Sequence, residues 1–193
     1  MPDIKSICVF CGARTGNKPV WKEAASELGK AMAERGITLV YGGGRIGIMS
    51  EIAQHAQENG GRVVGIIPDF LEKAEVGNQS CDELIVVNSM HERKQLMTER
   101  SDAFVVMPGG IGSLEEFFEV LTWRTLKLHD KPIIVVDIDG CWSPLAALID
   151  SLIKDGFAGA ETRQAMEIVT SVDGLLDCLE KASSSKAFDA GKT

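Results

Sequence analysis

Apolar residues along the chain occur in two kinds of block. Short blocks of four to six residues are apolar almost throughout, whereas longer blocks repeat apolar residues every three or four positions. The first kind is typical of strands buried on both faces of a sheet, and the second of amphipathic helices. The short blocks predict strands at residues 6–10, 37–41, 62–67, 84–87, 103–107 and 132–136. The long blocks predict helices at residues 20–35, 48–59, about 90–101, from 111 to about 128, and 145–154.

Strands and helices alternate along the chain with short connections. This order predicts a Rossmann-like α/β fold, a doubly wound parallel sheet flanked by helices. A single domain over residues 1–182 is expected, because 193 residues fit one core. Residues 183–193 begin with three serines and are expected to form a flexible tail. Ligands of such folds bind beyond the carboxyl ends of the strands.

Composition narrows the classes of partner. The net charge of −8 makes a nucleic-acid partner unexpected, because binding a polyphosphate chain requires a basic surface. A small anion remains compatible, since a few backbone N–H groups and arginines can hold one phosphate. No apolar run approaches the ~20 residues of a membrane helix, and residues 1–5 show no signal-peptide pattern. We therefore expect a cytoplasmic protein without a membrane partner.

Metal and thiol chemistry are not predicted. Cys8 and Cys11 have the spacing of a redox motif, but they lie on a strand, where residues three apart face opposite sides. The five cysteines form no disulfide framework, and the three histidines show no metal-ligand spacing. We expect no metal site.

Glycine-rich segments follow three of the predicted strands, at residues 12–16, 42–47 and 108–113. Glycine lets the backbone approach a ligand closely, and N–H groups at a helix start attract anions. Strand-to-helix turns also need glycine for their own geometry, so one loop alone decides little. Three loops at one sheet edge favour a nucleotide site. Residues 42–47 also match G-x-G-x-x-G, with Asp69 downstream, which leaves a dinucleotide-dependent oxidoreductase as an alternative.

The loop after the fifth predicted strand carries candidate chemistry. Residues 110–113 offer amides and a hydroxyl to a phosphate, and Glu116 follows in the first helical turn, where a carboxylate can orient a ribose hydroxyl or a water. The run from Ser113 to Glu116 also has the pattern of a capping box, which would make the glutamates structural. On this local pattern alone, capping is the favoured interpretation of Glu116.

Two adjacent cations, Arg93 and Lys94, stand near the start of the preceding predicted helix. Positive charge at this end opposes the helix macrodipole, so the pair is locally unfavourable. Binding of an anionic ligand would account for it. A solvated, charged helix is the alternative interpretation.

Several of these segments are similar to one family. Residues 108–116 (PGGIGSLEE) closely resemble the P-G-G-x-G-T-x-x-E signature of the LOG (Lonely Guy) family. Residues 90–94 (MHERK) resemble its M-H-x-R-K, and residues 10–12 and 41–49 resemble its first two loops. The resemblance runs from about residue 4 to residue 177 with the motifs in the expected order.

The chain departs from this family at three positions. Ser113 replaces the usual threonine, Ala13 stands where serine is common, and Ser50 stands where glycine is common. These changes leave the matching arginine and glutamate intact. They leave open whether the substrate is plain AMP or a nucleotide with a prenylated base.

The resemblance implies a cytokinin riboside 5′-monophosphate phosphoribohydrolase, an enzyme that releases an N6-substituted adenine and ribose 5-phosphate. It implies no metal or redox cofactor, and a homodimer with the site near the interface. The matching positions imply that Arg93 and Glu116 form the catalytic pair. The positions implied to bind substrate are Gly43, Gly44, Glu75, Lys94, Gly109, Gly110, Ile111, Gly112, Ser113, Leu114, Glu115 and Thr122.

The implied chemistry gives roles to this pair. Departure of the base builds positive charge on the ribose, which an ionised Glu116 would stabilise while positioning water. Arg93 would either pair with Glu116 or contact the phosphate, and both roles stay open. A nucleotide carrier without turnover is the main alternative, since fold does not fix function. A pyridoxal phosphate lysine decarboxylase is disfavoured, because Lys94, Lys127 and Lys131 lie in charged surroundings.

Overall fold

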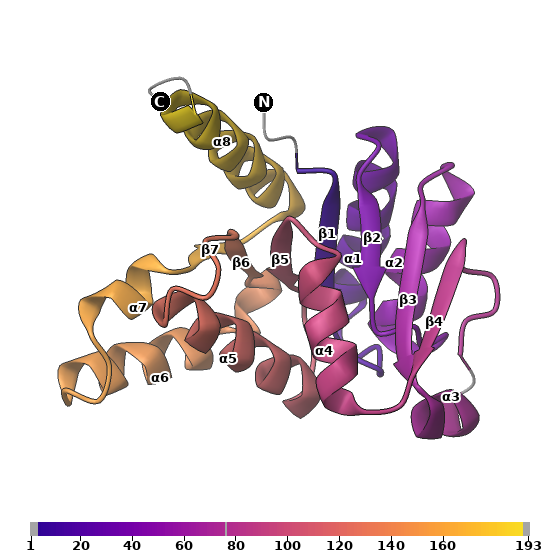
Figure 1. Ribbon diagram of the computed structural model, residues 1–193, viewed down its shortest axis with the longest axis horizontal. Coiled ribbons are helices and arrows are strands. Elements are labelled where there is room, and N and C mark those ends of the chain that lie inside the picture. The colour runs from indigo at the N-terminus through magenta and orange to yellow at the C-terminus, as the bar shows by residue number, and fades with distance from the viewer. Residues whose placement is uncertain (1–3, 76, 191–193) are drawn as a thin grey trace.

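The computed structural model describes residues 4–75 and 77–190. Its centre is a seven-stranded sheet in the order β4-β3-β2-β1-β5-β6-β7, in which all neighbouring strands run parallel (Figure 1). The predicted Rossmann-like α/β fold is confirmed. The strands are β1 (Ser6–Phe10), β2 (Thr38–Tyr41), β3 (Val63–Pro68), β4 (Glu83–Val87), β5 (Ala103–Val106), β6 (Ile133–Val136) and β7 (Glu167–Val169).

Helices cover both faces of the sheet (Figure 1). One face carries α1 (Pro19–Glu34), α2 (Gly47–Glu58) and α8 (Val172–Ala190). The other face carries α4 (Met90–Glu99), α5 (Ile111–Thr125) and α6 (Ser143–Lys154). The short elements are α3 (Asp69–Glu75), the 3₁₀ turn η1 (Ile138–Gly140) and α7 (Ala160–Gln164).

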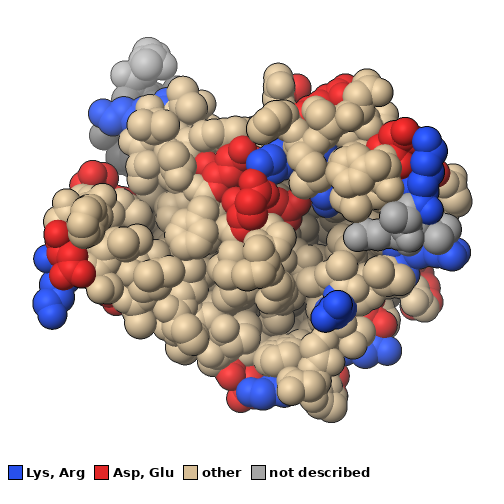
Figure 2. All heavy atoms as spheres, turned by 90° about the horizontal axis from the view of Figure 1, so that it is seen from below, with Lys and Arg blue, Asp and Glu red and all other residues tan. Residues whose placement is uncertain are grey.

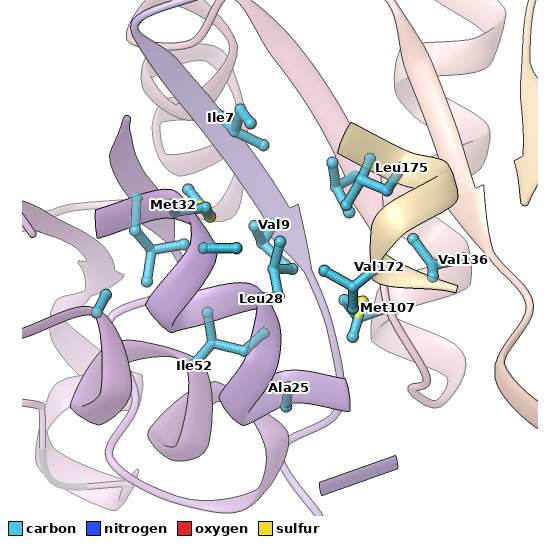
Figure 3. Close-up of a cluster of buried hydrophobic side chains, with 14 of the residues drawn as sticks. Ile7, Val9, Ala25, Leu28, Met32, Ile52, Met107, Val136, Val172 and Leu175 are labelled. Atoms are coloured by element: carbon cyan, nitrogen blue, oxygen red, sulfur yellow. The ribbon is translucent and has the colours of Figure 1, made fainter. Parts of the chain in front are cut away.

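The central strand β1 shows why the strands are apolar throughout. Ile7 and Val9 pack in the cluster with α1, α2 and α8, whereas Cys8 and Phe10 pack in the cluster with α4, α5 and α6. Successive side chains of a strand point to opposite faces, so burial on both faces requires an unbroken apolar run. Figure 3 shows the first cluster, with Leu28 lying beside the strand. Full burial of such a side chain contributes about 1.5–3 kcal/mol.

The structure contains elements beyond those predicted from the sequence. Helix α3, helix α7 and strand β7 are three to seven residues long, which is too short for a clear periodic signal. Helix α8 had a usable signal, because Val172, Leu175, Leu176 and Leu179 are all buried at helical spacing. It continues to Ala190, so residues 183–190, predicted as a flexible tail, are helical. None of the described helices has the length and apolar character to cross a membrane.

Helices α1 and α2 approach closely at Gly29. A Cβ built there would collide with the carbonyl oxygen of Ile52 and lie 3.0 Å from the backbone nitrogen of Ala56. Both obstacles are backbone atoms of α2, which cannot rotate away as a side chain can. Gly29 therefore sets the spacing of the two helices on this face.

Gly29→Ala is expected to destabilise the fold although alanine favours a helix by about 1 kcal/mol over glycine. The added methyl group forces the helices apart, and overpacking of this kind costs about 1–3 kcal/mol. The free energy of unfolding from urea titration measures the effect. Gly112→Ala is the matched control, because a Cβ at helical Gly112 meets no atom within 4 Å. Equal stability of both variants and the wild type would contradict the packing argument.

Candidate active site

A pocket of about 830 Å³ lies where the order of strands reverses. Strand β1 pairs with β2 on one side and with β5 on the other. The chain leaves β1 toward one face of the sheet and leaves β5 toward the other, which opens a crevice between the two loops. The wall is formed by residues 11–16, residues 108–113, Trp21, Ile48, Met49, Leu71, Met90, Arg93, Glu115, Glu116 and Cys141.

The loops after β1 and β5 are tied together at the mouth of this pocket. The backbone N–H of Gly12 donates to the carbonyl oxygen of Pro108 at 3.1 Å. A Cβ at Gly12 would lie 3.3 Å from the Cα of Gly109 and closer still to the carbonyl oxygen of Arg14. Glycine here therefore serves the contact between the two loops, which is the structural role that a glycine-rich turn can have.

Helix α5 starts at the pocket with free amide groups. Its N-cap is Gly110, which offers no side chain to the first turn. The capping box predicted from Ser113 to Glu116 is therefore wrong, because Ser113 already lies inside the helix. Its hydroxyl is buried next to Gly109, where a Cβ would collide with Ser113 Oγ. The first N–H groups of α5 consequently have no side-chain cap, and residues 111–113, which carry them, line the pocket.

Glu116 lies on the buried face of α5, and its residue is 8% exposed. Arg93 reaches it from α4, with Nη2 at 3.5 Å from Oε1 of the glutamate. Room for the guanidinium comes from Gly42, where a Cβ would collide with Nη2 of Arg93. The structure thus brings together the predicted catalytic pair, in the arrangement where the arginine pairs with the glutamate.

The start of α4 explains how Arg93 is held. Ser89 is the N-cap, and its Oγ accepts from the N–H of Glu92 at 3.1 Å. The carboxylate of Glu92 in turn accepts from the N–H of Asn88 at 2.8 Å. This capping arrangement fixes the first turn of the helix, and Glu92 places a negative charge where the macrodipole favours it. The capping motif of the region is therefore in α4, one helix earlier than predicted.

Burial raises the pKa of Glu116 to about 7, because loss of water disfavours the carboxylate. The Arg93 guanidinium acts in the opposite direction and does not offset the burial. Arg93 itself is poorly partnered, since its buried Nε has no hydrogen-bond acceptor within the described part of the chain. The carboxyl group is therefore divided between its two protonation states near neutral pH.

Lys94 forms ion pairs with two carboxylates of α5, and Glu116 is not one of them. Its Nζ lies 2.5 Å from Glu115 Oε1 and 3.0 Å from Glu119 Oε1, and it does not line the pocket. Burial lowers the pKa of Lys94, but hydrogen bonds to Glu115 and Glu119 outweigh burial and raise it. The predicted contact between Lys94 and a phosphate stays a prediction, and the ammonium is already neutralised by its neighbours.

Some of the remaining predicted substrate-binding residues line the pocket, and the others lie outside its wall. Residues 109–113 and Glu115 line the pocket, while Leu114 is packed behind them. Gly43 and Gly44 contact residues 77–78 instead, through the bridge between Gly44 and Gly77 and the hydrogen bond to Gly43 O. Thr122 is exposed further along α5 and donates to the carbonyl oxygen of Phe118. Glu75 ends α3, and its side chain lies outside the described residues.

Sequence reasoning missed the apolar part of the wall. Trp21, Met49, Leu71 and Met90 line the pocket without belonging to a glycine-rich loop. Trp21 is fixed by a hydrogen bond from Nε1 to the carbonyl oxygen of Ile138 at 3.1 Å. Trp21 had a signal in its position at the start of the helix after β1. Met49 and Met90 stand in segments that resemble the family's motifs, whereas Leu71 carried no signal.

The cysteines near the site have raised pKa values, and the described residues offer no group of metal ligands. Cys8 and Cys11 pack on opposite sides of the sheet, as predicted, and burial raises the pKa of both thiols. The described residues include no group of three or more His, Cys, Asp or Glu that could hold a metal ion. Figure 2 looks onto the carboxyl edge of the sheet, where acidic side chains gather near the middle with basic side chains beside them. An anion at this edge therefore meets individual cations in place of a uniformly positive field.

Replacing Glu116 by glutamine is expected to stabilise the protein at high pH. The pKa is about 7 in the folded chain against an ordinary 4.5, so the wild type loses stability as pH rises between these values. Glu116→Gln escapes this loss and should exceed the wild type by about 3 kcal/mol at pH 8, with no difference near pH 4. Urea unfolding at both pH values, with exposed Glu23→Gln as control, measures this. A difference independent of pH would contradict the raised pKa.

Comparisons with known proteins place the chain in a family. The sequence model of the family described as "Possible lysine decarboxylase" matches residues 49–179. The probable cytokinin riboside 5′-monophosphate phosphoribohydrolase LOGL1 of Oryza sativa subsp. japonica is 42% identical over 187 residues, covering 97% of this chain and 84% of its own. The cytokinin riboside 5′-monophosphate phosphoribohydrolase LOG1 of Arabidopsis thaliana is 40% identical, covering 96% of this chain and 90% of its own.

Solved structures show the same architecture at lower sequence identity. The Moco carrier protein from Chlamydomonas reinhardtii has a TM-score of 0.71 at 21% identity, covering 94% of this chain and 99% of its own. The molybdenum cofactor binding protein from Rippkaea orientalis has a TM-score of 0.70 at 21% identity, with the same coverage. At this identity the likeness shows the fold alone. The relatives at about 40% identity and the match over residues 49–179 show that the chain belongs to the LOG family.

Proposed function

We propose that the protein hydrolyses the N-glycosidic bond of adenosine 5′-monophosphates, with or without an N6 substituent, and releases the base and ribose 5-phosphate. The observation that carries the proposal is the buried Glu116 beside Arg93 in a pocket that begins at the start of α5. The relatives at about 40% identity are named for this reaction on cytokinin riboside 5′-monophosphates.

The N-terminus of α5 is suited to bind the phosphate of the substrate. Its first N–H groups have no side-chain cap, and a helix of 15 residues adds the positive end of its macrodipole. A Cβ at Gly110 or Gly112 would meet no protein atom within 4 Å. The protein's own packing therefore does not require glycine at these two positions, whereas close approach of a phosphate to the backbone would.

The pair Arg93 and Glu116 supplies what bond cleavage needs. As the bond between C1′ and the base nitrogen breaks, its electron pair leaves with the base and positive charge builds on the ribose. The carboxylate form of Glu116 stabilises that charge and accepts a proton from the water that attacks C1′. Arg93 keeps part of the Glu116 population ionised in spite of burial. The departing base takes up a proton, which completes the hydrolysis.

A carrier function has less support on this chain. Holding a nucleotide requires the amides of α5 and a cation, but it does not require a buried carboxylate next to the guanidinium. The carboxyl of Glu116 is costly to bury, since its pKa is shifted to about 7. A group that destabilises the fold and adds nothing to phosphate binding is better explained by turnover.

Glu116→Gln and Arg93→Gln are expected to remain folded and to lose activity. Glu116→Gln should lose about a hundredfold or more, the usual effect of removing an acid–base group, and Arg93→Gln should lose activity because Glu116 is then less ionised. The assay measures base and ribose 5-phosphate released from AMP and from N6-isopentenyladenosine monophosphate. Its rate with wild type should rise with pH through about 7, because the carboxylate is the active form. Glu23→Gln, exposed on α1, is the control.

Three results would separate the alternatives in this assay. Binding of nucleotide by the wild type without release of base would favour the carrier. Unchanged turnover in Glu116→Gln would exclude the glutamate from the chemistry. The faster of the two substrates identifies the preferred base.

We further propose a homodimer that works in the cytoplasm. The five cysteines are free thiols, which suits a reducing compartment. Thr122 lies two turns beyond Glu115 on α5, about 10 Å along the axis, and so does not reach the pocket of its own chain. A second copy would allow it to meet substrate. Large exposed apolar side chains, including Ile111 at 82% and Phe157 at 84%, offer contact area.

Sedimentation equilibrium is expected to give twice the chain mass of 20.8 kDa at micromolar concentration. Ile111→Asp or Phe157→Asp should shift the equilibrium toward the single chain if that side chain lies in the contact, because a charge would be buried there. A mass of one chain at all concentrations would contradict the dimer. This result would leave the proposed chemistry untouched.

A further inference from the structure

Of the two arginines that line the pocket and the two lysines beside it, Lys18 and Lys94, all but one are in an ion pair. Arg93 pairs with Glu116 at 3.5 Å, and Lys94 is held by Glu115 and Glu119 outside the pocket wall. Lys18 is paired with Asp139 at 2.7 Å. A dianionic phosphate at the start of α5 therefore needs a positive partner that these residues do not supply.

Arg14 is that exception. It belongs to the loop after β1 and lines the pocket, and its side chain is exposed. Among the described residues its guanidinium makes no hydrogen bond or ion pair, unlike that of Arg93. An arginine can bind two phosphate oxygens at once through its planar fork, which is the geometry that favours arginine at phosphate sites.

The backbone around Arg14 is held in place on three sides. Gly12 donates to Pro108 in the loop that precedes α5, which joins the two loops through their backbones. A Cβ at Gly47 would collide with Arg14 N and with Ala13, which shows how tightly the next loop supports this segment. The far end is anchored by Lys18 on Asp139. A free side chain on a fixed backbone is suited to contact a ligand without reorganising the loop.

We propose that Arg14 binds the 5′-phosphate of the substrate across the pocket from the first turn of α5, and so selects nucleotides over nucleosides. This inference rests on the proposed function for the identity of the substrate. The observation behind it is the position of an unpaired arginine in the same pocket as the uncapped first turn of α5. It assigns to Arg14 the phosphate contact that the sequence motif suggested for Lys94.

The test compares ligands that differ only in the phosphate. Titration calorimetry or ligand-observed NMR measures binding of AMP, adenosine, ribose 5-phosphate and ribose to wild type, Arg14→Gln and Arg14→Lys. Arg14→Gln is expected to weaken AMP and ribose 5-phosphate by about ten- to a hundredfold, the effect of one charged hydrogen-bonded contact. Adenosine and ribose should be unaffected. Arg14→Lys should recover part of the loss, since it restores charge without the fork.

Arg45→Gln is the matched control, because Arg45 is an exposed arginine of the neighbouring loop that does not line the pocket. It should bind all four ligands as the wild type does. Equal binding of ribose 5-phosphate by Arg14→Gln and wild type would overturn the proposal. So would equal loss of AMP and adenosine, which would mean that the substitution had disturbed the loop.

These outcomes are separate from the proposed hydrolysis. Binding is measured without turnover, so a wild type that binds AMP through Arg14 without cleaving it would refute the hydrolase alone. Conversely, wild-type release of base from AMP with an unchanged KM in Arg14→Gln would refute the role of Arg14 alone.

Discussion

The site depends on one constraint, which is the burial of a carboxyl group at the point where the strand order of the sheet reverses. Glu116 is almost fully covered, and a lone carboxylate cannot be buried without large cost. Arg93 compensates part of this cost from a different helix. To place the two groups together, α4 and α5 must begin at fixed positions. Capping at Ser89 meets that requirement for α4, and the hydrogen bond from Gly12 to Pro108 in the preceding loop meets it for α5.

The ion pair is better understood as chemistry than as a stabilising bridge. Buried pairs commonly lose as much through desolvation as they gain through attraction. The raised pKa of Glu116 shows that desolvation prevails here. Stability must come from elsewhere, and the two apolar clusters on either side of β1 supply it. The fold therefore tolerates an unfavourably buried carboxyl group at the carboxyl edge of the sheet, because the apolar clusters supply the stability.

The parallel fold could be predicted from sequence, because unbroken apolar strands are a local signal. The pair Arg93 and Glu116 was indicated by the resemblance to the family, whereas the local pattern alone favoured a capping role for Glu116. The partners of Lys94 could not be predicted, since Glu115 and Glu119 lie on another helix and meet it only after folding. The N-cap of α5 was misplaced because Ser113 has the right residue type three positions too late. Arg14 carried no motif, and its place in the pocket follows from the pairing of β1 with β5.

Gly42 illustrates how a motif glycine can serve a ligand site without touching a ligand. A methyl group at this position would meet the end of the Arg93 side chain, which is flexible and can swing aside. The fold would therefore tolerate the change, while the arginine would leave its carboxylate. The substitution therefore acts first on the pairing of Arg93 with Glu116 and much less on the packing of the apolar clusters. A screen that ranks variants by thermal resistance or expression would accept such a substitution and miss the loss of the enzyme.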